Sequence, residues 1–331
     1  MTNRIVWLDY GKAIAIYLVV LAHTALYKPA EAFIYTFHMP FFFFMSGYLF
    51  SFEKYPSYLQ FLKRRFKQLI IPYLILNALT YLLWFFILRK VGDDANESVS
   101  VFSPIIAALT VNAKSMVHDI PLWFLAALFL VENLYYLLYK NEKYSIVVTI
   151  TLFLLAFLNS TFNPVRLPFC IDISLVAILF YRLGCILKEK GDKIFKPYLF
   201  ALSAAGVVLA FIFNGKVAMH TNTYNNLFIF VAGGISGCYA MSYICMILQK
   251  LCGERTFVRS IAKDTLLICA FHLIVFAALK GVMLYIFKID PSVLTNTVFP
   301  NVIFALLSVI ICLFICKILD KFNLKRFIIP N

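Results

Sequence analysis

The sequence predicts an all-α membrane protein with about ten transmembrane helices and both termini in the cytoplasm. Hydrophobic residues make up 63% of the 331 residues and charged residues 14%, whereas soluble domains average about 45–50% and about 25%. The mean hydropathy is +0.87. Runs such as LIIPYLILNALTYLLWFFIL are apolar on every side, and about 20 such residues span a bilayer as a helix. These observations exclude a soluble enzyme, a disordered chain and a disulfide-stapled secreted module, and they disfavour a β-barrel, whose strands alternate.

Apolar runs bounded by polar and turn-forming residues locate the expected spans. We expect helices at 5–27, 33–52, 66–89, 120–139, 144–160, 170–187, 196–213, 225–249, 264–287 and 297–318. Together they form one membrane domain over 1–331, without a repeat or a separate soluble domain. The longest weakly apolar stretch is 90–119, and within it 101–111 is too short to span. That segment is expected to be either an interfacial or re-entrant helix or a plain surface loop.

The distribution of basic residues predicts the orientation. The formal net charge is +14, and 22 of the 30 lysines and arginines fall in loops or helix ends on the side of the N-terminus. This asymmetry is what the positive-inside rule requires of cytoplasmic segments. An even number of spans keeps the basic C-terminal tail inside, which favours ten. Topology therefore accounts for the charge, and no nucleic-acid partner is expected.

The N-terminal region and the cysteines predict no processing, disulfide framework or metal site. The first helix lacks a short basic leader and is too long for a signal-peptide core, so no cleavable signal is expected. The eight cysteines lie within or beside apolar helices and form no CxxC pair. They are interpreted as small packing residues.

The first expected helix carries three ionisable residues, Asp9, Lys12 and His23. An ionisable residue at membrane depth costs about 2.5–3.5 kcal/mol on insertion scales and usually faces a cavity or a partner. Lys12 and His23 are eleven positions apart, so at about 100° per residue they share one helix face, about 16 Å apart along the axis. Asp9 precedes Lys12 by one helical turn and can pair with it. The alternative is a snorkelling Lys12 and a structural, hydrogen-bonded His23.

The second expected helix brings a further histidine to the same outer side. His38 enters the membrane where the first helix ends, and Pro40 suits a first helical turn. Ser46 and Gly47 permit close approach between helices. Two histidines at similar depth on adjacent helices can share a site, although each alone can equally be structural.

Charged and aromatic residues elsewhere are weaker candidates. Lys63, Arg64, Arg65 and Lys67 lie at the cytoplasmic mouth, where they either reflect topology and attraction to anionic lipid or form a phosphate clamp. Trp123 is expected at an outer membrane interface. Glu132 lies deeper and needs a partner. His272 lies about eight residues into the ninth expected helix.

Three segments resemble the opening of the acyltransferase 3 family. They are RIVWLDYGKAIAIYLVVLAH, FHMPFFFFMSGYLF and LKRRFKQLIIPY, and they are most similar to its fucose 4-O-acetylase-like branch of bacterial integral-membrane O-acetyltransferases. LWFLAALFLVE and DTLLICAFH fall where that family has similar segments. The family has a basic residue followed, after ten intervening positions, by a histidine, and this pattern corresponds to Lys12 and His23. Many members have arginine at the first position, and lysine lacks the bidentate fork.

The resemblance implies transfer of an acyl group, usually acetyl from acetyl-CoA, to a hydroxyl of a cell-surface or lipid-linked glycan in the bacterial cytoplasmic membrane. His23 would then be the general base. Lys12, held by Asp9, would contact the donor, and Arg64 and Arg65 would bind its phosphates. His38 and Ser46 are candidates for orienting the base or stabilising the oxyanion, and Trp123, Glu132 and His272 are candidates for binding the acceptor. No permanently bound cofactor and no metal are expected.

Two other functions fit the same composition. Ten helices with buried histidine, glutamate and lysine also suit a transporter or a flippase for a lipid-linked sugar, although the inverted repeat typical of such proteins is not apparent. A scaffold that has lost activity is a further alternative, and the intact Lys12 and His23 argue against it. Transfer of label from acetyl-CoA distinguishes an enzyme from a transporter.

Overall fold

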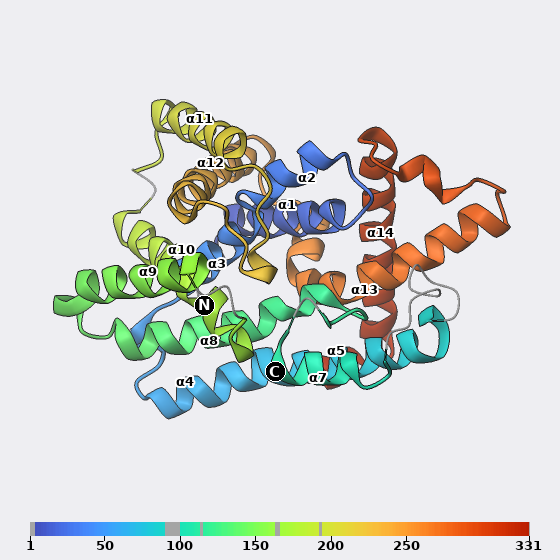
Figure 1. Ribbon diagram of the computed structural model, residues 1–331, viewed down its shortest axis with the longest axis horizontal. Helices are drawn as coiled ribbons and strands as arrows, with labels where there is room; N and C mark the ends of the chain where they lie inside the picture. The colour runs from blue at the N-terminus through green and yellow to red at the C-terminus, as the bar shows by residue number, and fades with distance from the viewer. Residues whose placement is uncertain (1–3, 90–99, 113–114, 163–165, 192–193, 331) are drawn as a thin grey trace.

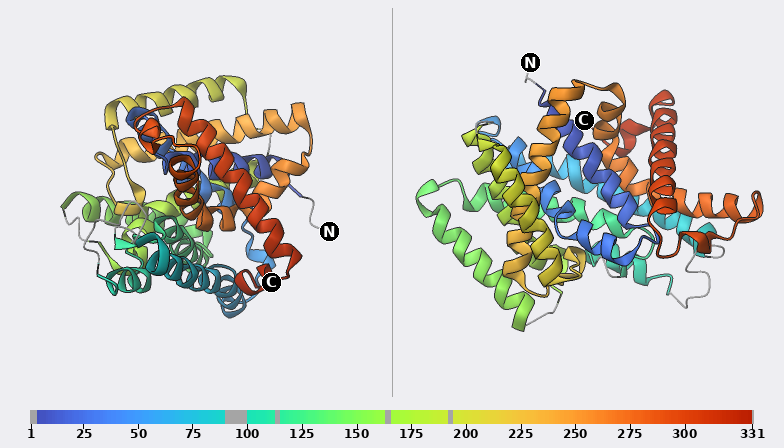
Figure 2. Two further views of the ribbon diagram at one scale, coloured as in Figure 1. Left: turned by 90° about the vertical axis from the view of Figure 1, so that its right-hand side faces the viewer. Right: turned by 90° about the horizontal axis from the view of Figure 1, so that it is seen from above.

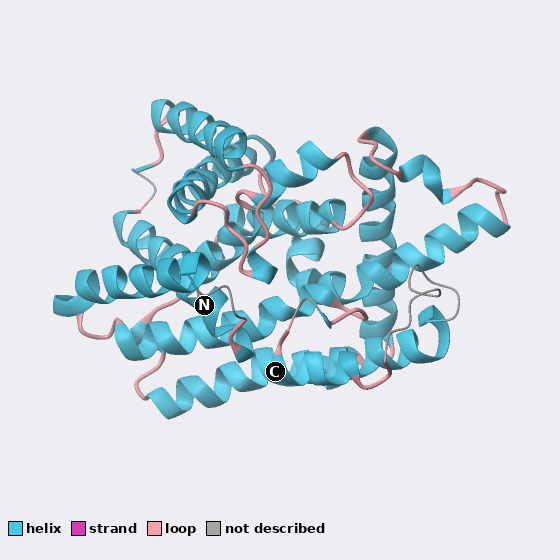
Figure 3. Cartoon of the chain, in the orientation of Figure 1, coloured by secondary structure: helices cyan, strands magenta, loops and turns pink. Residues whose placement is uncertain are grey.

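A computed structural model describes residues 4–89, 100–112, 115–162, 166–191 and 194–330. Within these residues all the regular secondary structure is helical, and turns and loops connect the helices (Figure 3). The α-helices are α1 (Val6–Ala22), α2 (Lys28–Tyr35), α3 (His38–Leu49), α4 (Tyr58–Arg65), α5 (Ile71–Leu83), α7 (Ser103–Thr110), α8 (Trp123–Leu138), α9 (Ser145–Phe162), α10 (Ile171–Lys190), α11 (Pro197–Asn214), α12 (Leu227–Cys252), α13 (Thr256–Tyr285), α14 (Phe299–Lys321) and α15 (Lys325–Ile328).

Eight continuous helices in the described part of the chain are long and apolar enough to cross a bilayer. They are Tyr58–Leu88, Ile120–Leu138, Glu142–Phe162, Pro168–Lys190, Pro197–Asn214, Leu227–Cys252, Thr256–Tyr285 and Phe299–Lys321. The first of these joins α4 and α5 through a π-helical segment, Phe66–Ile70. The protein is therefore a polytopic, multi-pass helical membrane protein, as predicted.

The other two expected spans correspond to the shorter helices α1 and α3. With 17 and 12 residues, they extend only about 25 Å and about 18 Å at 1.5 Å per residue. Both are largely buried: α1 packs against α3, α12, α13 and α14 in the middle of the bundle (Figure 1). Short helices are tolerated at membrane depth where other protein segments, rather than lipid, surround their ends.

The first helix ends earlier than predicted because the chain after it pairs with a distant loop. The amide of Asn296 donates to the carbonyl of Ala25 at 2.8 Å, and the amide of Tyr27 donates to the carbonyl of Thr297 at 3.0 Å. These bonds require an extended backbone after His23. His23 is consequently the C-cap residue of α1, next to the segment that leads into α14.

The second expected span is divided. A break at Thr36 and Phe37 separates α2 from α3, and the Phe37 backbone (φ −140°, ψ −19°) leaves the helical region. The four consecutive phenylalanines of α3, Phe41 to Phe44, are buried and pack inside the protein rather than against lipid. The break could not be predicted from the apolar composition of 33–52, because hydrophobicity alone does not distinguish one helix from two.

Small residues let α3 cross α10 at close range. A methyl group added at Gly47 would overlap the backbone carbonyl of Tyr181, and one added at Gly184 would overlap that of Phe44. The thiol of Cys185 also donates to the carbonyl of Gly47 at 3.2 Å. The close approach predicted at Gly47 is confirmed. Seven of the eight cysteines are buried, which agrees with a packing role.

Contacts near the chain ends fix which helix ends share a side. Arg4 forms ion pairs with Asp9 and with Glu254, which precedes α13. Lys325 of α15 pairs with Asp264, in the third turn of α13. The starts of α1 and α13 and the C-terminal helix therefore lie together, and Figure 2 shows both chain ends toward the same side. We call this the inner side.

The segment 90–119 is described in part. Residues 101–111 include the short helix α7, whose Pro104 and Ala107 are buried while Phe102 and Ile106 are exposed. Tyr73 of α5 donates to the carbonyl of Ala108 at 2.5 Å and so ties α7 to the bundle. Residues 90–99 and 113–114 of this expected loop lie outside the described residues.

Candidate functional site

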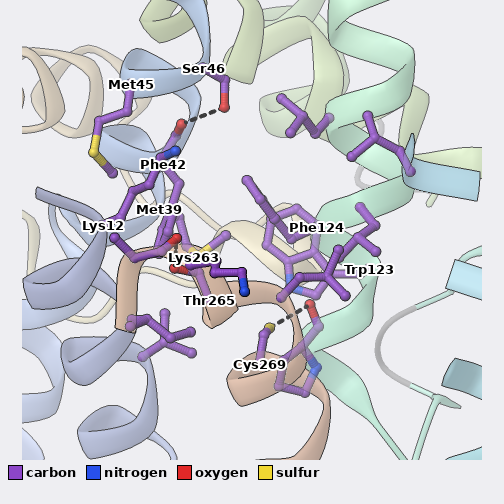
Figure 4. Close-up of a pocket in the computed structure, with 18 of the residues that line it drawn as sticks. Lys12, Met39, Phe42, Met45, Ser46, Trp123, Phe124, Lys263, Thr265 and Cys269 are labelled. Atoms are coloured by element: carbon purple, nitrogen blue, oxygen red, sulfur yellow. Dashed lines mark hydrogen bonds between the residues drawn. The ribbon is translucent and has the colours of Figure 1, made fainter. Parts of the chain in front are cut away.

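Two cavities meet at His23. The inner cavity, about 280 Å³, extends from His23 toward the inner side and is lined by α1, α3, α8 and α13. Lys12 and Lys263 are its charged residues, and most of its remaining wall is apolar. Figure 4 shows Met39 and Phe42 of α3 on one side of this space and Trp123 and Phe124 of α8 on the other.

The outer cavity lies beyond His23, away from Lys12. Its volume is about 640 Å³, and its walls come from residues 83–88, α13, α14 and the loop that precedes α14. Thr24, Ser292, Thr295 and Lys280 are polar residues in an otherwise largely apolar lining. His23 lines both cavities. Its position at the end of α1, produced by the pairing of residues 25–27 with 296–297, places the imidazole between them.

Hydrogen bonding fixes the tautomer of His23. Its Nδ1 lies 2.7 Å from the carbonyl oxygen of Val19. A carbonyl only accepts, so Nδ1 carries the proton and Nε2 is left as an unprotonated lone pair. His38 and His272 repeat this arrangement on the carbonyls of Ile34 and Ile268, at 2.8 and 3.1 Å. The three imidazoles therefore present Nε2 as a proton acceptor.

Four histidines gather around this point. The rings of His23 and His272 pack edge to face with centroids 5.2 Å apart. His38 and His220 also interact electrostatically with His23. His220, in the loop after α11, is held by burial and by neighbouring positive charge at a pKa of about 4. It is therefore neutral at pH 7.

The carboxylate of Glu31 borders the histidine group. Glu31 is 7% exposed, is paired with Lys28 at 2.8 Å, and interacts electrostatically with His23. A nearby carboxylate stabilises the positive charge that an imidazole gains when it accepts a proton. The arrangement suits His23 to proton transfer at the meeting point of two cavities.

Comparison with known sequences decides the family. The profile of the acyltransferase 3 family, described as an acyltransferase domain, matches residues 5–319. The chain belongs to this family. No curated protein and no solved structure matches it. The resemblance of the opening segments is thereby confirmed at the level of the family, and the protein is a membrane acyltransferase.

In this acyltransferase Lys12 and His23 share one face of α1, as their spacing predicts, because both line the inner cavity. The predicted pairing of Asp9 with Lys12 is wrong: Asp9 forms its ion pair with Arg4 at 2.7 Å. Asp9 attracts Lys12 only from a longer distance. Arg4 lies before the first residue of α1, so helical spacing gives no indication of this ion pair.

His38 and Ser46 occupy different positions relative to the base. Ser46 lines the inner cavity and donates from Oγ to the carbonyl of Phe42 at 3.0 Å. His38 is 3% exposed, lines neither cavity, and stacks on Tyr35 with ring centroids 5.1 Å apart. His38 interacts electrostatically with His23, and Ser46 shares the inner cavity with it, so the roles of both stay predictions.

Trp123, expected at an outer membrane interface, is 4% exposed and forms part of the inner cavity wall, so its side chain is surrounded by protein rather than lipid. The rings of Phe43 and Phe124 pack against it. A tryptophan that follows a proline-containing turn at the start of an apolar helix is typical of a residue that anchors the helix at a membrane interface. Only the packing of α3 against α8 makes it a cavity residue.

Glu132 and Arg65 form a buried ion pair. Arg65 Nε lies 2.9 Å from Glu132 Oε2, with the two side chains 19% and 2% exposed. The Arg65 guanidinium also covers the rings of Tyr55 and Phe61. Glu132 thus has the partner that its depth required. Neither residue of this pair, nor Arg64, lines either cavity.

Three residues of the site were missed by the sequence analysis. Lys263 directly precedes the expected span 264–287, but α13 begins at Thr256, and Lys263 lines the inner cavity. Glu31 and His220 lie in segments expected to connect spans. No local pattern indicates that those segments fold back over His23.

Proposed function

We propose that this acyltransferase moves an acetyl group from acetyl-CoA, entering from the cytoplasmic side, to a hydroxyl of a cell-surface or lipid-linked glycan such as O-antigen or exopolysaccharide. His23 is the general base. The observation that carries this proposal is that His23 lines both the inner and the outer cavity. A donor in one and an acceptor in the other would meet at its Nε2.

The inner cavity suits the thin arm of the donor. Lys12 lies about three helical turns from His23 on the same face, and the walls between them include Met39, Phe42 and Phe124. These apolar walls leave little room for water beside the thioester, which limits hydrolysis as a competing reaction. The outer cavity is more than twice as large and carries hydroxyl groups, as a sugar acceptor requires.

The reaction follows from the tautomer of His23. Nε2 removes the proton of the acceptor hydroxyl while the oxygen attacks the thioester carbonyl. The tetrahedral intermediate collapses with cleavage of the carbon–sulfur bond, and the CoA thiolate takes the proton from the imidazolium. Glu31 stabilises the transient imidazolium. His272 holds the ring by edge-to-face packing. The products are an O-acetyl ester, CoA and neutral His23.

Purified protein is incubated with isolated bacterial glycans and acetyl-CoA that is labelled in its acetyl group. The protein should transfer the label to the glycan. The expected product is alkali-labile, since base hydrolyses an O-acetyl ester and leaves an N-acetyl group intact. Movement of glycan across reconstituted vesicles without incorporation of label would instead support the flippase alternative and overturn the proposal. Protein-free detergent micelles provide the control for spontaneous transfer.

A further inference from the structure

A second pocket adjoins the inner cavity at Lys263. This C-terminal pocket, about 380 Å³, is lined by Lys263, Asp320, Asn323, Lys325, Arg326 and Ile329. Lys263 also lines the inner cavity. One extended ligand can therefore occupy both spaces by passing this side chain.

The charges in the C-terminal pocket favour an anion. Three side chains are cationic and one, Asp320, is anionic. Asp320 lies 3.5 Å from both Lys263 and Lys325, so neither contact is close. The side chains of Lys263 and Asp320 are 65% and 43% exposed, which leaves them accessible to a ligand.

Lys325 anchors the pocket. Its ammonium pairs directly with Asp264 of α13, and although burial opposes the charge, Asp264 and then Asp320 raise the pKa of Lys325. Lys325 is thus charged at neutral pH and fastens α15 to α13. Lys263 and Arg326 are left on the exposed part of the pocket.

We propose that the C-terminal pocket binds the nucleotide phosphates of the acyl-CoA donor, with Lys263 and Arg326 as the phosphate ligands. This inference rests on the proposed function and places the phosphates differently from the prediction for Arg64 and Arg65. The guanidinium of Arg65 is already neutralised by Glu132. Neither arginine lines the inner cavity, whereas Lys263 joins that cavity to the phosphate pocket.

Binding of CoA to the purified protein in phosphatidylcholine nanodiscs tests the inference. Lys263→Ala and Arg326→Ala should each weaken binding about five- to tenfold, as expected when one charge-assisted hydrogen bond to phosphate is lost. Asp320→Asn should strengthen it about two- to fivefold, because it removes an anion from the pocket without removing a cation. Opposite signs at neighbouring positions cannot arise from loss of folding.

A shorter ligand and a control variant identify which part of CoA the pocket binds. The variants should bind pantetheine, which lacks the nucleotide, as the unmodified protein does. Arg255→Ala is the matched control, because Arg255 is an exposed arginine that lines neither pocket, and it should leave CoA affinity unchanged. Unchanged CoA affinity in Lys263→Ala and Arg326→Ala would overturn the inference, as would effects confined to phosphatidylglycerol nanodiscs, which would identify a lipid headgroup as the occupant. If the unmodified protein binds no CoA, the proposed function fails as well.

Discussion

His23→Ala should lower acyl transfer by about 10²–10⁴-fold, the contribution typical of a general base. The imidazole is the group that borders both cavities, and its Nδ1 hydrogen bond to Val19 reserves Nε2 for the acceptor hydroxyl. Alanine removes the proton acceptor together with the Nδ1 hydrogen bond and the ring contact with His272. Initial rates with labelled acetyl-CoA and a glycan acceptor measure the effect.

CoA affinity and folding separate a lost base from a damaged site. His23→Ala should bind CoA as the unmodified protein does and give the same elution profile on size exclusion. His118→Ala is the matched control, because His118 lies outside both cavities and contacts Asn77 and Tyr81 instead. Transfer by His23→Ala at nearly the unmodified rate would show that the base is another group.

Glu132→Ala should destabilise the fold by about 3–5 kcal/mol, since it leaves the buried charge of Arg65 without its partner. Glu132 is 2% exposed and lies 2.9 Å from Arg65. The pair connects α8 to the junction of α4 with the π-helical segment that follows it. A fall in the midpoint of thermal unfolding, measured in the same detergent, reports the loss.

The neighbouring arginine offers a direct control. Arg64→Ala removes an exposed charge from the same turn and should change stability by no more than about 0.5 kcal/mol. A double variant, Arg65→Met with Glu132→Leu, should recover most of the stability, because apolar residues can replace a buried ion pair at little cost. Equal midpoints for Glu132→Ala and Arg64→Ala would contradict a structural role for the pair.

Local periodicity accounts for the parts of this molecule that the sequence predicts well. Eight of the ten expected spans coincide with helices long and apolar enough to cross a bilayer, and Lys12 and His23 both line the inner cavity, as their shared helix face predicts. These properties depend on residues one to three helical turns apart, within one segment. The apolar character of the spans is likewise a property of each segment alone.

Contacts between distant segments account for the parts that were wrong or missed. The early end of α1 depends on residues 296–297, and the partner of Asp9 is Arg4, outside the helix. Lys263 reaches the inner cavity because α13 packs beside α1. The cluster of His38, His220 and His272 around His23 joins four segments. A single sequence gives no indication of such contacts between distant segments.

Sided transfer in vesicles tests most directly whether donor and acceptor meet at His23 from opposite cavities. Protein is reconstituted so that its N-terminal side faces outward, acetyl-labelled CoA is added outside, and the glycan acceptor is trapped inside. We expect label on the trapped glycan with the unmodified protein and a loss of about 10²–10⁴-fold with His23→Ala. Label that appears only when donor and acceptor are on the same side, or that persists in His23→Ala, would contradict this expectation.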